Sequence, residues 1–278
     1  SMGGIGWMAG NFWLEYTSNQ NRIVNEKPEK LSDRLQQLGI DQAFFFSLAD
    51  EFFYSQYPQK RGQILSNQTP EDKLWQWRWY AIADKLAEKL ETLTIDARRR
   101  LGNYSTDDID RWRSQLRRLN ISSAAFNDLT DAGFINLFSE ETRGRNLIGL
   151  PIGQVWQAIA TDTMKGLQSR KSLEEVRFTR GSFQETVNGT LQPGEGKIYL
   201  AWLQDEQILH VRLEPNSLEV LLSIYPPRNY RPRSRGLIGD SPENQWRGET
   251  RTSGYYQFVV VSNSDQPIEY SLVLFADN

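Results

Sequence analysis

Three carboxylates in the first half of the chain have the residue type and spacing for acid–base chemistry. Asp50 is followed directly by Glu51, and Asp50 and Asp131 each lie five residues after a phenylalanine. Two carboxylates are enough for glycoside hydrolysis, provided that their environments separate an acid from a base. Because Asp50 and Asp131 occupy equivalent positions of a repeat, we expect similar environments. We interpret them as helix-edge acids paired with Arg61 or Arg143, and an acid-dependent hydrolase is the least favoured hypothesis.

Nucleophilic and metal chemistry lack the residues that they require. The chain has no cysteine and a single histidine, His210. This residue alternates with Leu209, Val211 and Leu213, so it is expected on the polar face of a strand, and no Gly-x-Ser-x-Gly turn accompanies it. The absence of cysteine excludes disulfides, zinc–thiolate sites and iron–sulfur clusters. The sequence therefore predicts no catalytic residue, metal or cofactor.

A basic segment between two predicted strands is the most distinctive candidate binding site. The stretch from Tyr225 to Gly236 is rich in proline and carries these candidate ligand-binding residues: Arg228, Tyr230, Arg231, Arg233 and Arg235. Proline makes such a loop stiff, and clustered guanidinium groups bind phosphate, sulfate or acidic protein surfaces. The alternative is a solvated loop whose arginine stems lie on the sheet.

Most tryptophans lie at helical spacing and are expected in the core, with one exception. Trp75 and Trp79 fall on the apolar stripe of a predicted helix, whereas Trp77 lies off it. Trp77 is therefore the tryptophan we expect to be exposed, as a possible anchor for a partner or a sugar ring.

These candidates are positioned by two kinds of secondary structure. Residues 28–168 show helical periodicity, with start signals such as Thr69-Pro70 and Thr94. Residues 169–183 are interpreted as a polar linker. From 184 to 278 the pattern alternates with period two, and turn signals such as Asn188-Gly189 divide it. The sequence predicts an α+β protein of two domains, an all-α domain followed by an all-β sandwich or jelly roll.

The helical domain contains an internal repeat, about 40–93 and 121–168. Trp79-Tyr80-Ala81-Ile82-Ala83 returns as Trp156-Gln157-Ala158-Ile159-Ala160, and Arg61-Gly62 returns as Arg143-Gly144. Phe45, Leu48 and Phe53 likewise return as Phe126, Leu129 and Phe134. Residues shared by two copies are most simply explained by packing. A ligand is expected in the groove between the copies.

The first residues and the net charge bear on the cellular context. Ser1-Met2 is typical of a cloning remnant, and residues 3–14 form an uncharged, apolar run. This run is shorter than the roughly 20 residues that span a bilayer. Two interpretations of residues 1–20 stay open, a tail docked on the domain or the end of a transmembrane helix. A net charge of -3 argues against nucleic acid as a partner.

Three stretches of the β part resemble the bacterial pre-peptidase C-terminal (PPC) sandwich. They are Gly189-Thr190-Leu191-Gln192-Pro193-Gly194, the run from Gln207 to Tyr225, and Gly254-Tyr255-Tyr256-Gln257-Phe258. The resemblance implies a non-catalytic accessory domain of secreted or surface-displayed proteins. Some such domains bind calcium, but no aspartate-rich loop here would supply the ligands.

The chain also resembles the C-terminal region of membrane-anchored serine/threonine kinases from cyanobacteria. The apolar start, Tyr57-Pro58-x-x-Arg61-Gly62, both Trp-x-Ala-Ile-Ala motifs and the terminal sandwich carry the resemblance. It implies a periplasmic region of a single-pass membrane protein. Kinase motifs such as His-Arg-Asp and Asp-Phe-Gly are absent from these residues. We therefore predict a non-catalytic, extracytoplasmic region that binds an unidentified ligand, envelope component or partner protein. A secreted scaffold or adhesion protein with no signalling role is the alternative.

Overall fold

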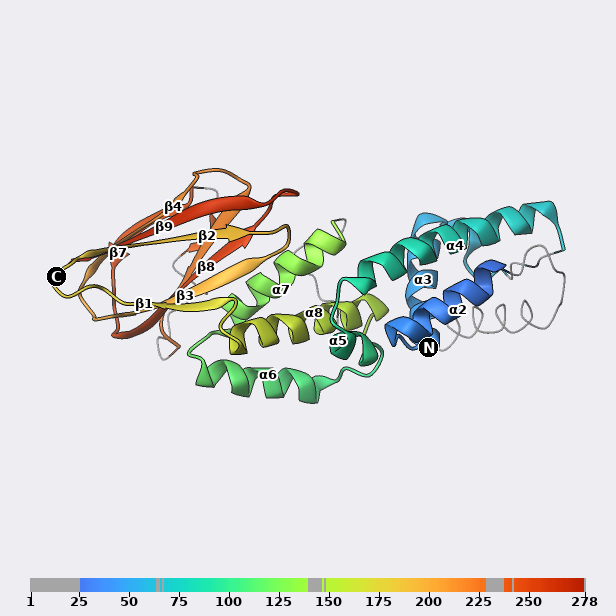
Figure 1. Ribbon diagram of the computed structural model, residues 1–278, viewed down its shortest axis with the longest axis horizontal. Coiled ribbons are helices and arrows are strands. Elements are labelled where there is room, and N and C mark those ends of the chain that lie inside the picture. The colour runs from blue at the N-terminus through green and yellow to red at the C-terminus, as the bar shows by residue number, and fades with distance from the viewer. Residues whose placement is uncertain are drawn as a thin grey trace. The chain divides into compact units, whose positions relative to one another are not determined.

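A helical N-terminal part and a C-terminal part of two β-sheets make up the protein (Figure 1). The computed structural model describes residues 26–63, 66, 68–139, 147, 149–228, 238–241 and 243–277. The predicted α+β class with two domains is confirmed. Residues 1–20, for which a docked tail or a membrane helix was predicted, lie outside the described residues.

The first helical elements of the described residues are α2 (Glu26–Leu38), α3 (Gln42–Gln56), the 3-10 turn η1 (Pro58–Lys60), α4 (Pro70–Glu91) and α5 (Ile95–Arg99). The helices α3, α4 and α5 begin at capping side chains. The side chains of Asp41, Thr69 and Thr94 each accept a hydrogen bond from a backbone N–H in the first turn of the helix that follows. The helix starts predicted at Thr69-Pro70 and Thr94 are therefore confirmed.

The next helices are α6 (Thr106–Arg118), α7 (Ser123–Leu137) and α8 (Pro151–Gln168). α6 opens with a capping box, in which Ser105 and Asp108 each bond the other's backbone N–H. Between α5 and α6, Gly102 has a φ of 88°, a left-handed conformation that only glycine adopts without strain.

The ends of α3 and α7 agree with a duplication. Both helices are 15 residues long, and their C-caps, Tyr57 and Phe138, have φ/ψ of -127°/69° and -129°/73°. The two cap N–H groups bond the carbonyls of Phe53 and Phe134, each at 2.8 Å. Such similar ends in segments far apart in sequence are expected of two copies of one unit.

The two copies pack their first helices against different partners. α3 contacts α4 and η1, and its Phe45, Leu48 and Phe53 side chains are fully buried. α7 instead contacts α6 and the strands β3, β5 and β8. By contacts, the chain divides into two compact units: one holds the described residues before Ser105 together with 147–158, and the other holds 105–139 and 159–277. The helices α6 and α7 thus group with the β-sheets.

The strands form two sheets. They are β1 (Leu173–Val176), β2 (Gln184–Leu191), β3 (Gly196–Leu203), β4 (Ile208–Glu214), β5 (Val220–Tyr225), β6 (Ile238–Ser241), β7 (Gln245–Glu249), β8 (Gly254–Ser262) and β9 (Ile268–Asp277). The order is β1-β3-β8-β5-β6 in one sheet and β2-β9-β4-β7 in the other. β1 pairs in parallel with β3, whereas the other pairs are antiparallel.

Two sequence interpretations of the β part need correction. β1 lies inside the segment 169–183 that was interpreted as a linker, and its backbone pairs with β3 from Leu173 to Val176. Asn188-Gly189 was interpreted as a turn but lies within β2, paired with β9. A Cβ atom at Gly189 would lie 2.4 Å from the Tyr270 hydroxyl oxygen, so the glycine makes room for that ring rather than for a turn.

The space between the sheets is filled by alternating side chains from both. Tyr199 of β3 and Tyr270 of β9 come from opposite sheets, and their hydroxyl oxygens lie 2.6 Å apart within the core. This bond gives each of the two phenols a hydrogen-bond partner within the hydrophobic core.

The outer face of the first sheet is covered by α7. Gln257 of β8 is fully buried there, accepts from the backbone N–H of Ser122 at 2.7 Å and donates to the Pro226 carbonyl at 3.1 Å. The hydroxyl of Tyr225 donates to Asp128 of α7 at 2.5 Å. These bonds fix α7 on the sheet.

Candidate functional site

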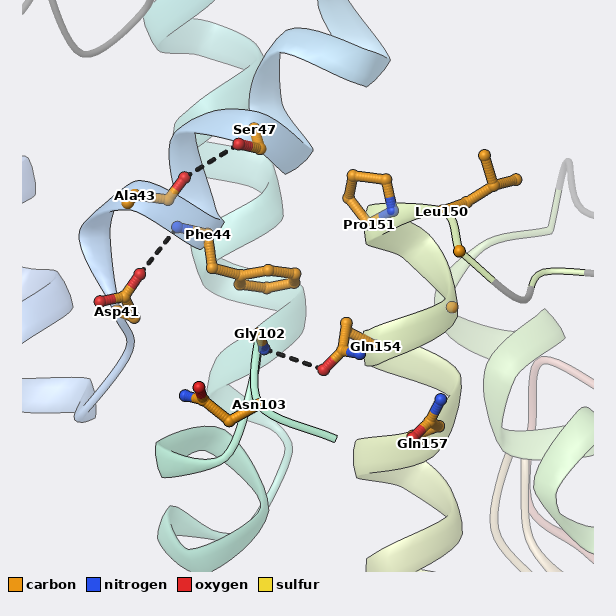
Figure 2. A pocket seen from close by; sticks show the side chains of 12 residues that line it. Asp41, Ala43, Phe44, Ser47, Gly102, Asn103, Leu150, Pro151, Gln154 and Gln157 are labelled. Atoms are coloured by element: carbon orange, nitrogen blue, oxygen red, sulfur yellow. Dashed lines mark hydrogen bonds between the residues drawn. The ribbon is translucent and has the colours of Figure 1, made fainter. Parts of the chain in front are cut away.

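A pocket of about 470 Å³ lies where both copies of the repeat meet within the first compact unit (Figure 2). Asp41, Phe44 and Ser47 line it from the start of α3. Leu150 lines it from just before α8, and Gln157 from the second turn of that helix. Between them lie Gly102 and Asn103. The sequence predicted a groove between the copies, and a pocket is present there; its volume falls in the range of small-molecule sites, roughly 300–1,000 Å³.

One wall of the pocket is held by the side-chain amide of Gln154. Its Oε1 accepts from the backbone N–H groups of Gly102 and Tyr104, each at 3.0 Å, and its Nε2 donates to the Tyr104 carbonyl at 3.1 Å. This amide therefore ties the chain between α5 and α6 to α8. The amide oxygen and one of the two N–H groups are thus engaged by the backbone, so Gln154 shapes this wall of the pocket.

The start of α3 supplies the charged group of the pocket. Asp41 caps the helix with Oδ1, which accepts from the Phe44 N–H at 2.8 Å, and the side chain is exposed. The Ser47 hydroxyl donates to the Ala43 carbonyl at 3.1 Å (Figure 2). With one carboxylate, several amides and an apolar patch of Phe44, Leu150 and Pro151, the pocket suits a small polar ligand that is neutral or positively charged.

The pocket has few ionisable groups. Among its described lining residues, Asp41 is the only acidic or basic side chain. The paired carboxylates that glycoside hydrolysis uses are therefore not found among these residues.

Asp50 is not the helix-edge acid that the sequence suggested. It is only 3% exposed, and its Oδ1 accepts from the indole N–H of Trp79 at 2.9 Å. Its Oδ2 has no hydrogen-bond partner. Arg61, the expected partner, lies instead 5.9 Å from the ring centre of Tyr54. The pairing was missed because it depends on the packing of α3 against α4, which spacing alone does not show.

Burial changes the acidity of Asp50. Removal of the carboxyl from water raises its pKa from 3.8 to about 7, and the hydrogen bond from Trp79 opposes this in part. Asp131 occupies the equivalent position of α7 in the other compact unit. The two acids therefore belong to separate units, which offers no support for a hydrolytic pair.

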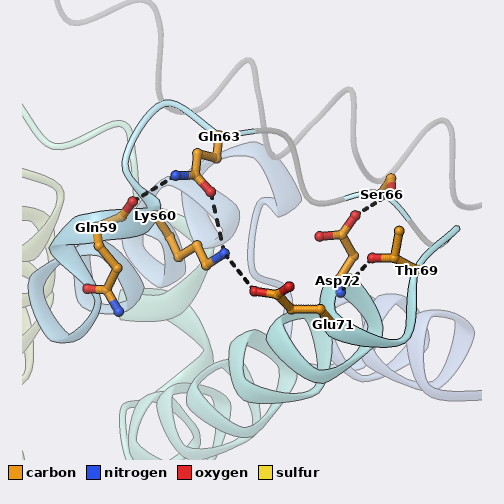
Figure 3. Close-up of polar contacts among 7 residues, drawn as sticks. All are labelled: Gln59, Lys60, Gln63, Ser66, Thr69, Glu71 and Asp72. Atoms are coloured by element: carbon orange, nitrogen blue, oxygen red, sulfur yellow. Dashed lines mark hydrogen bonds and ion pairs between the residues drawn. The ribbon is translucent and has the colours of Figure 1, made fainter.

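The polar cluster before α4 is a structural cap (Figure 3). The Thr69 hydroxyl accepts from the Asp72 N–H at 3.1 Å, and the Ser66 hydroxyl donates to the Asp72 carboxylate at 2.5 Å. The Lys60 ammonium lies 3.9 Å from a Glu71 carboxylate oxygen and 4.7 Å from the ring centre of Trp75. These contacts tie η1 to the first turn of α4.

The predicted binding residues are placed differently by the structure. Trp77 is 49% exposed on α4, as its position off the apolar stripe indicated. Arg228 follows β5 and is exposed. Tyr230, Arg231, Arg233 and Arg235 lie outside the described residues, as do Arg143 and Gly144.

The motif residues of the repeat are not equally buried in the two copies. Ala81 is exposed on α4, whereas its equivalent Ala158 is buried in α8; Ala83 and Ala160 are both buried. Ile82 is half-buried and Ile159 is buried. The shared motif therefore sits in a different environment in each copy.

Sequence reasoning missed the aromatic pair Trp202 and Tyr255. Trp202 is 56% exposed, and its ring packs edge-to-face against that of Tyr255 with 5.2 Å between centres. Its position between the inward-facing Ala201 and Leu203 placed it on the outer face of the strand. Its exposure was not predictable, because it depends on where the covering helix ends.

Two further structural findings concern membranes and metals. Within the part of the chain that the structure describes, no helix is both long and apolar enough to cross a bilayer. In the same residues, no three histidine or acidic side chains gather where they would hold a metal ion.

Sequence comparison identifies a homologue from a cyanobacterium. No protein-family model matches the chain. The serine/threonine-protein kinase-like protein E of Synechocystis sp. (strain ATCC 27184 / PCC 6803 / Kazusa) is 29% identical over 307 residues, which cover 97% of this chain and 47% of that protein. The chain thus spans about half the length of the curated relative it matches. The resemblance to cyanobacterial kinases of this kind is confirmed.

Solved structures similar to the β part are more distant. The Aeromonas hydrophila periplasmic inhibitor of g-type lysozyme, PliG, is 16% identical with a TM-score of 0.34, over 38% of this chain and 96% of that one. The PPC domain of a Bacillus anthracis collagenase is 12% identical with a TM-score of 0.27, over 36% of this chain and 93% of that one. At these scores the similarity carries no argument about function.

Proposed function

We propose that this chain is the non-catalytic, extracytoplasmic binding region of a membrane-anchored serine/threonine kinase. In this proposal it recognises a ligand, envelope component or partner protein and reports binding to a kinase domain in the same polypeptide. A helix upstream anchors it to the membrane, and the binding region lies on the periplasmic side.

The observation that carries the proposal is the extent of the match to the kinase-like relative. Nearly the whole of this chain, 97%, aligns with 47% of that protein. About half of the relative's length therefore lies outside the match. The present chain contains none of the kinase motifs. A kinase domain in the unmatched part of the relative accounts for both facts.

The pocket between the copies is the proposed ligand site. It is lined by residues of both copies, its wall is held by Gln154, and its chemistry is that of binding. A ligand there contacts the start of α3 and the start of α8 at once. Such a ligand fixes one copy of the repeat against the other, which gives binding a structural consequence beyond the pocket itself.

The experiment that tests the proposal is to sequence the source gene upstream of the codon for Gly3. We expect an apolar span joined to the apolar run at residues 3–14, preceded by basic residues and by the kinase motifs. A cleavable signal peptide immediately upstream would instead identify a secreted scaffold or adhesion protein, and a start codon there would identify a self-contained binding protein. In both cases the signalling role would be wrong.

A further inference from the structure

A second pocket, of about 250 Å³, lies in the β-rich unit, away from the repeat. Asn120 lines it from the connection between α6 and α7, Trp202 from the end of β3, Arg228 from the segment after β5, and Tyr255 from the start of β8. Its volume is below the roughly 300–1,000 Å³ of sites that enclose drug-sized ligands. The pocket therefore accommodates a single ring with its substituents.

An exposed aromatic pair forms one side of this pocket. Trp202 and Tyr255 are direct partners in the register of β3 and β8, and their ring planes meet at 84°. The outer face of the same strand is covered elsewhere: Ile198 and Leu200 are 0% and 4% exposed, whereas Trp202 is 56% exposed. Helix α7 packs on β3, but it does not cover the Trp202 side chain, which stays accessible to solvent.

The Tyr255 ring is held in place by a hydrogen bond to the neighbouring strand β1. Its hydroxyl donates to Glu175 Oε1 of β1 at 3.4 Å, and Glu175 forms a two-bond pair with the guanidinium of Arg177 at 3.2 and 3.3 Å. A tyrosine fixed in this way supports the Trp202 indole edge-on. The exposed indole is thus an ordered surface on which a flat or ring-shaped ligand can stack.

A positively charged side chain, Arg228, also lines the pocket. Although Arg228 is largely exposed, partial burial of its guanidinium lowers its pKa, and the positive charge of Arg117 in the last turn of α6 lowers the pKa further. Neither arginine forms an ion pair with any carboxylate among the described residues. Two neighbouring guanidinium groups that have no ion-pair partner in the described part of the chain favour a bound anion, which relieves their repulsion and accepts their hydrogen bonds.

Asn120 adds a neutral hydrogen-bonding group. Its φ of 59° is left-handed, a conformation that asparagine adopts more readily than most residues, and its side chain is exposed. A carboxamide both donates and accepts, as a sugar hydroxyl does. The pocket thus combines a ring-stacking surface, a cationic side chain and an amide.

We propose that this pocket binds one acidic sugar ring, either a uronic acid or a sugar phosphate. The apolar face of the ring stacks on Trp202, a hydroxyl bonds Asn120, and the anionic group lies against Arg228. The site is distinct from the pocket of the repeat, and the proposal does not depend on the chain belonging to a kinase.

The test is a titration of the intact, ¹⁵N-labelled chain followed by the indole N–H resonance of Trp202, assigned through W202F. The probes are glucuronate, glucose 6-phosphate, glucose and inorganic phosphate. We expect at least one acidic sugar to shift this resonance and to bind about tenfold or more tightly than glucose or phosphate, because only an acidic sugar combines ring stacking with a charge-assisted hydrogen bond. Which acidic sugar binds identifies carboxylate or phosphate as the anionic group.

Variants separate the two halves of the site. W202A and R228Q are each expected to weaken binding of the acidic sugar about tenfold or more. F183A and R180Q, at an exposed phenylalanine and an exposed arginine elsewhere in the same unit, are the matched controls and should leave it unchanged. Urea unfolding checks that W202A and R228Q fold as the natural chain does.

Three results overturn the proposal. If phosphate binds as tightly as glucose 6-phosphate, and W202A does not change its affinity, the pocket is a simple anion site. Glucose that binds as tightly as the acidic sugars would remove the role of Arg228. An indole resonance of Trp202 that none of the four probes shifts would mean that the pocket does not bind sugars of this class.

Discussion

Replacing Asp50 with asparagine is expected to make the chain more stable than its natural form above about pH 7. The natural carboxyl is 3% exposed and has one hydrogen-bond partner, so its charged form is unfavourable in the folded protein. Asparagine keeps the acceptor for the Trp79 indole N–H and carries no charge. We expect a gain of about 1–3 kcal/mol in the free energy of unfolding at pH 8.

The sign of the pH dependence follows from the direction of the pKa change. The pKa of Asp50 is raised from 3.8 to about 7, so between these values the folded protein binds a proton that the unfolded chain does not. Stability from this group is fully present below pH 3.8 and is lost as pH rises through about 7. The separation of the two pKa values sets an upper limit of about 4 kcal/mol.

Urea unfolding of both proteins from about pH 4 to pH 8 measures this effect. The difference in unfolding free energy between D50N and the natural chain should be small at the acid end and grow with pH. D84N is the matched control, because Asp84 is an exposed aspartate on α4, and its difference should stay flat. A D50N difference that does not change with pH would show that Asp50 is not buried with a raised pKa.

Truncation of Trp79 is expected to have the largest effect on stability. Its side chain is 5% exposed, lies 5.7 and 5.2 Å from the ring centres of Phe46 and Tyr80, and donates to Asp50. W79A removes the ring and leaves both Asp50 oxygens without a partner. We expect a loss of about 3–5 kcal/mol, whereas W79F, which keeps a ring but not the N–H, should lose about 1–3 kcal/mol.

Trp77 provides the matched comparison on the same helix. It is 49% exposed, so W77A should change the unfolding free energy by no more than about 0.5 kcal/mol. Chemical unfolding of W79A, W79F and W77A side by side distinguishes the two tryptophans. Equal losses for W79A and W77A would contradict the assignment of Trp79 to the core and Trp77 to the surface.

The helix starts were predictable because their signals are local. Thr69 with Pro70, and Thr94, act on backbone N–H groups within the next turn, and the structure places the caps there. The strongly alternating strands β4 and β9 were predictable for the same reason, since their pattern reports two faces of one sheet.

The strands that sequence reasoning missed depend on distant partners. β1 has the pattern Leu-Glu-Glu-Val, and it becomes a strand because its backbone pairs with β3. β2 contains Asn188-Gly189, which is a turn signal in isolation and a space for the Tyr270 ring in the sheet. A local pattern does not contain this information.

The candidate site residues likewise divide into those that a local pattern predicted and those that depend on tertiary packing. The positions of Trp77 and Arg228 followed from stripe and loop patterns, whereas the burial of Asp50 and the exposure of Trp202 are set by how α3 and α7 pack. The pocket between the copies was expected from the duplication alone. Its lining residues were not, because Gly102 and Asn103 come from the connection between α5 and α6.

The most direct test of the proposed extracytoplasmic position is cysteine labelling of the full-length natural protein in its membrane. This chain has no cysteine, so Arg180→Cys places one at an exposed position of the β-rich unit. Ala201→Cys, at a fully buried position, is the control and should react only after denaturation. The account predicts that a membrane-impermeant maleimide labels Arg180→Cys, over the background of the unsubstituted protein, in intact spheroplasts. Labelling that requires broken membranes would place this chain in the cytoplasm and contradict the account.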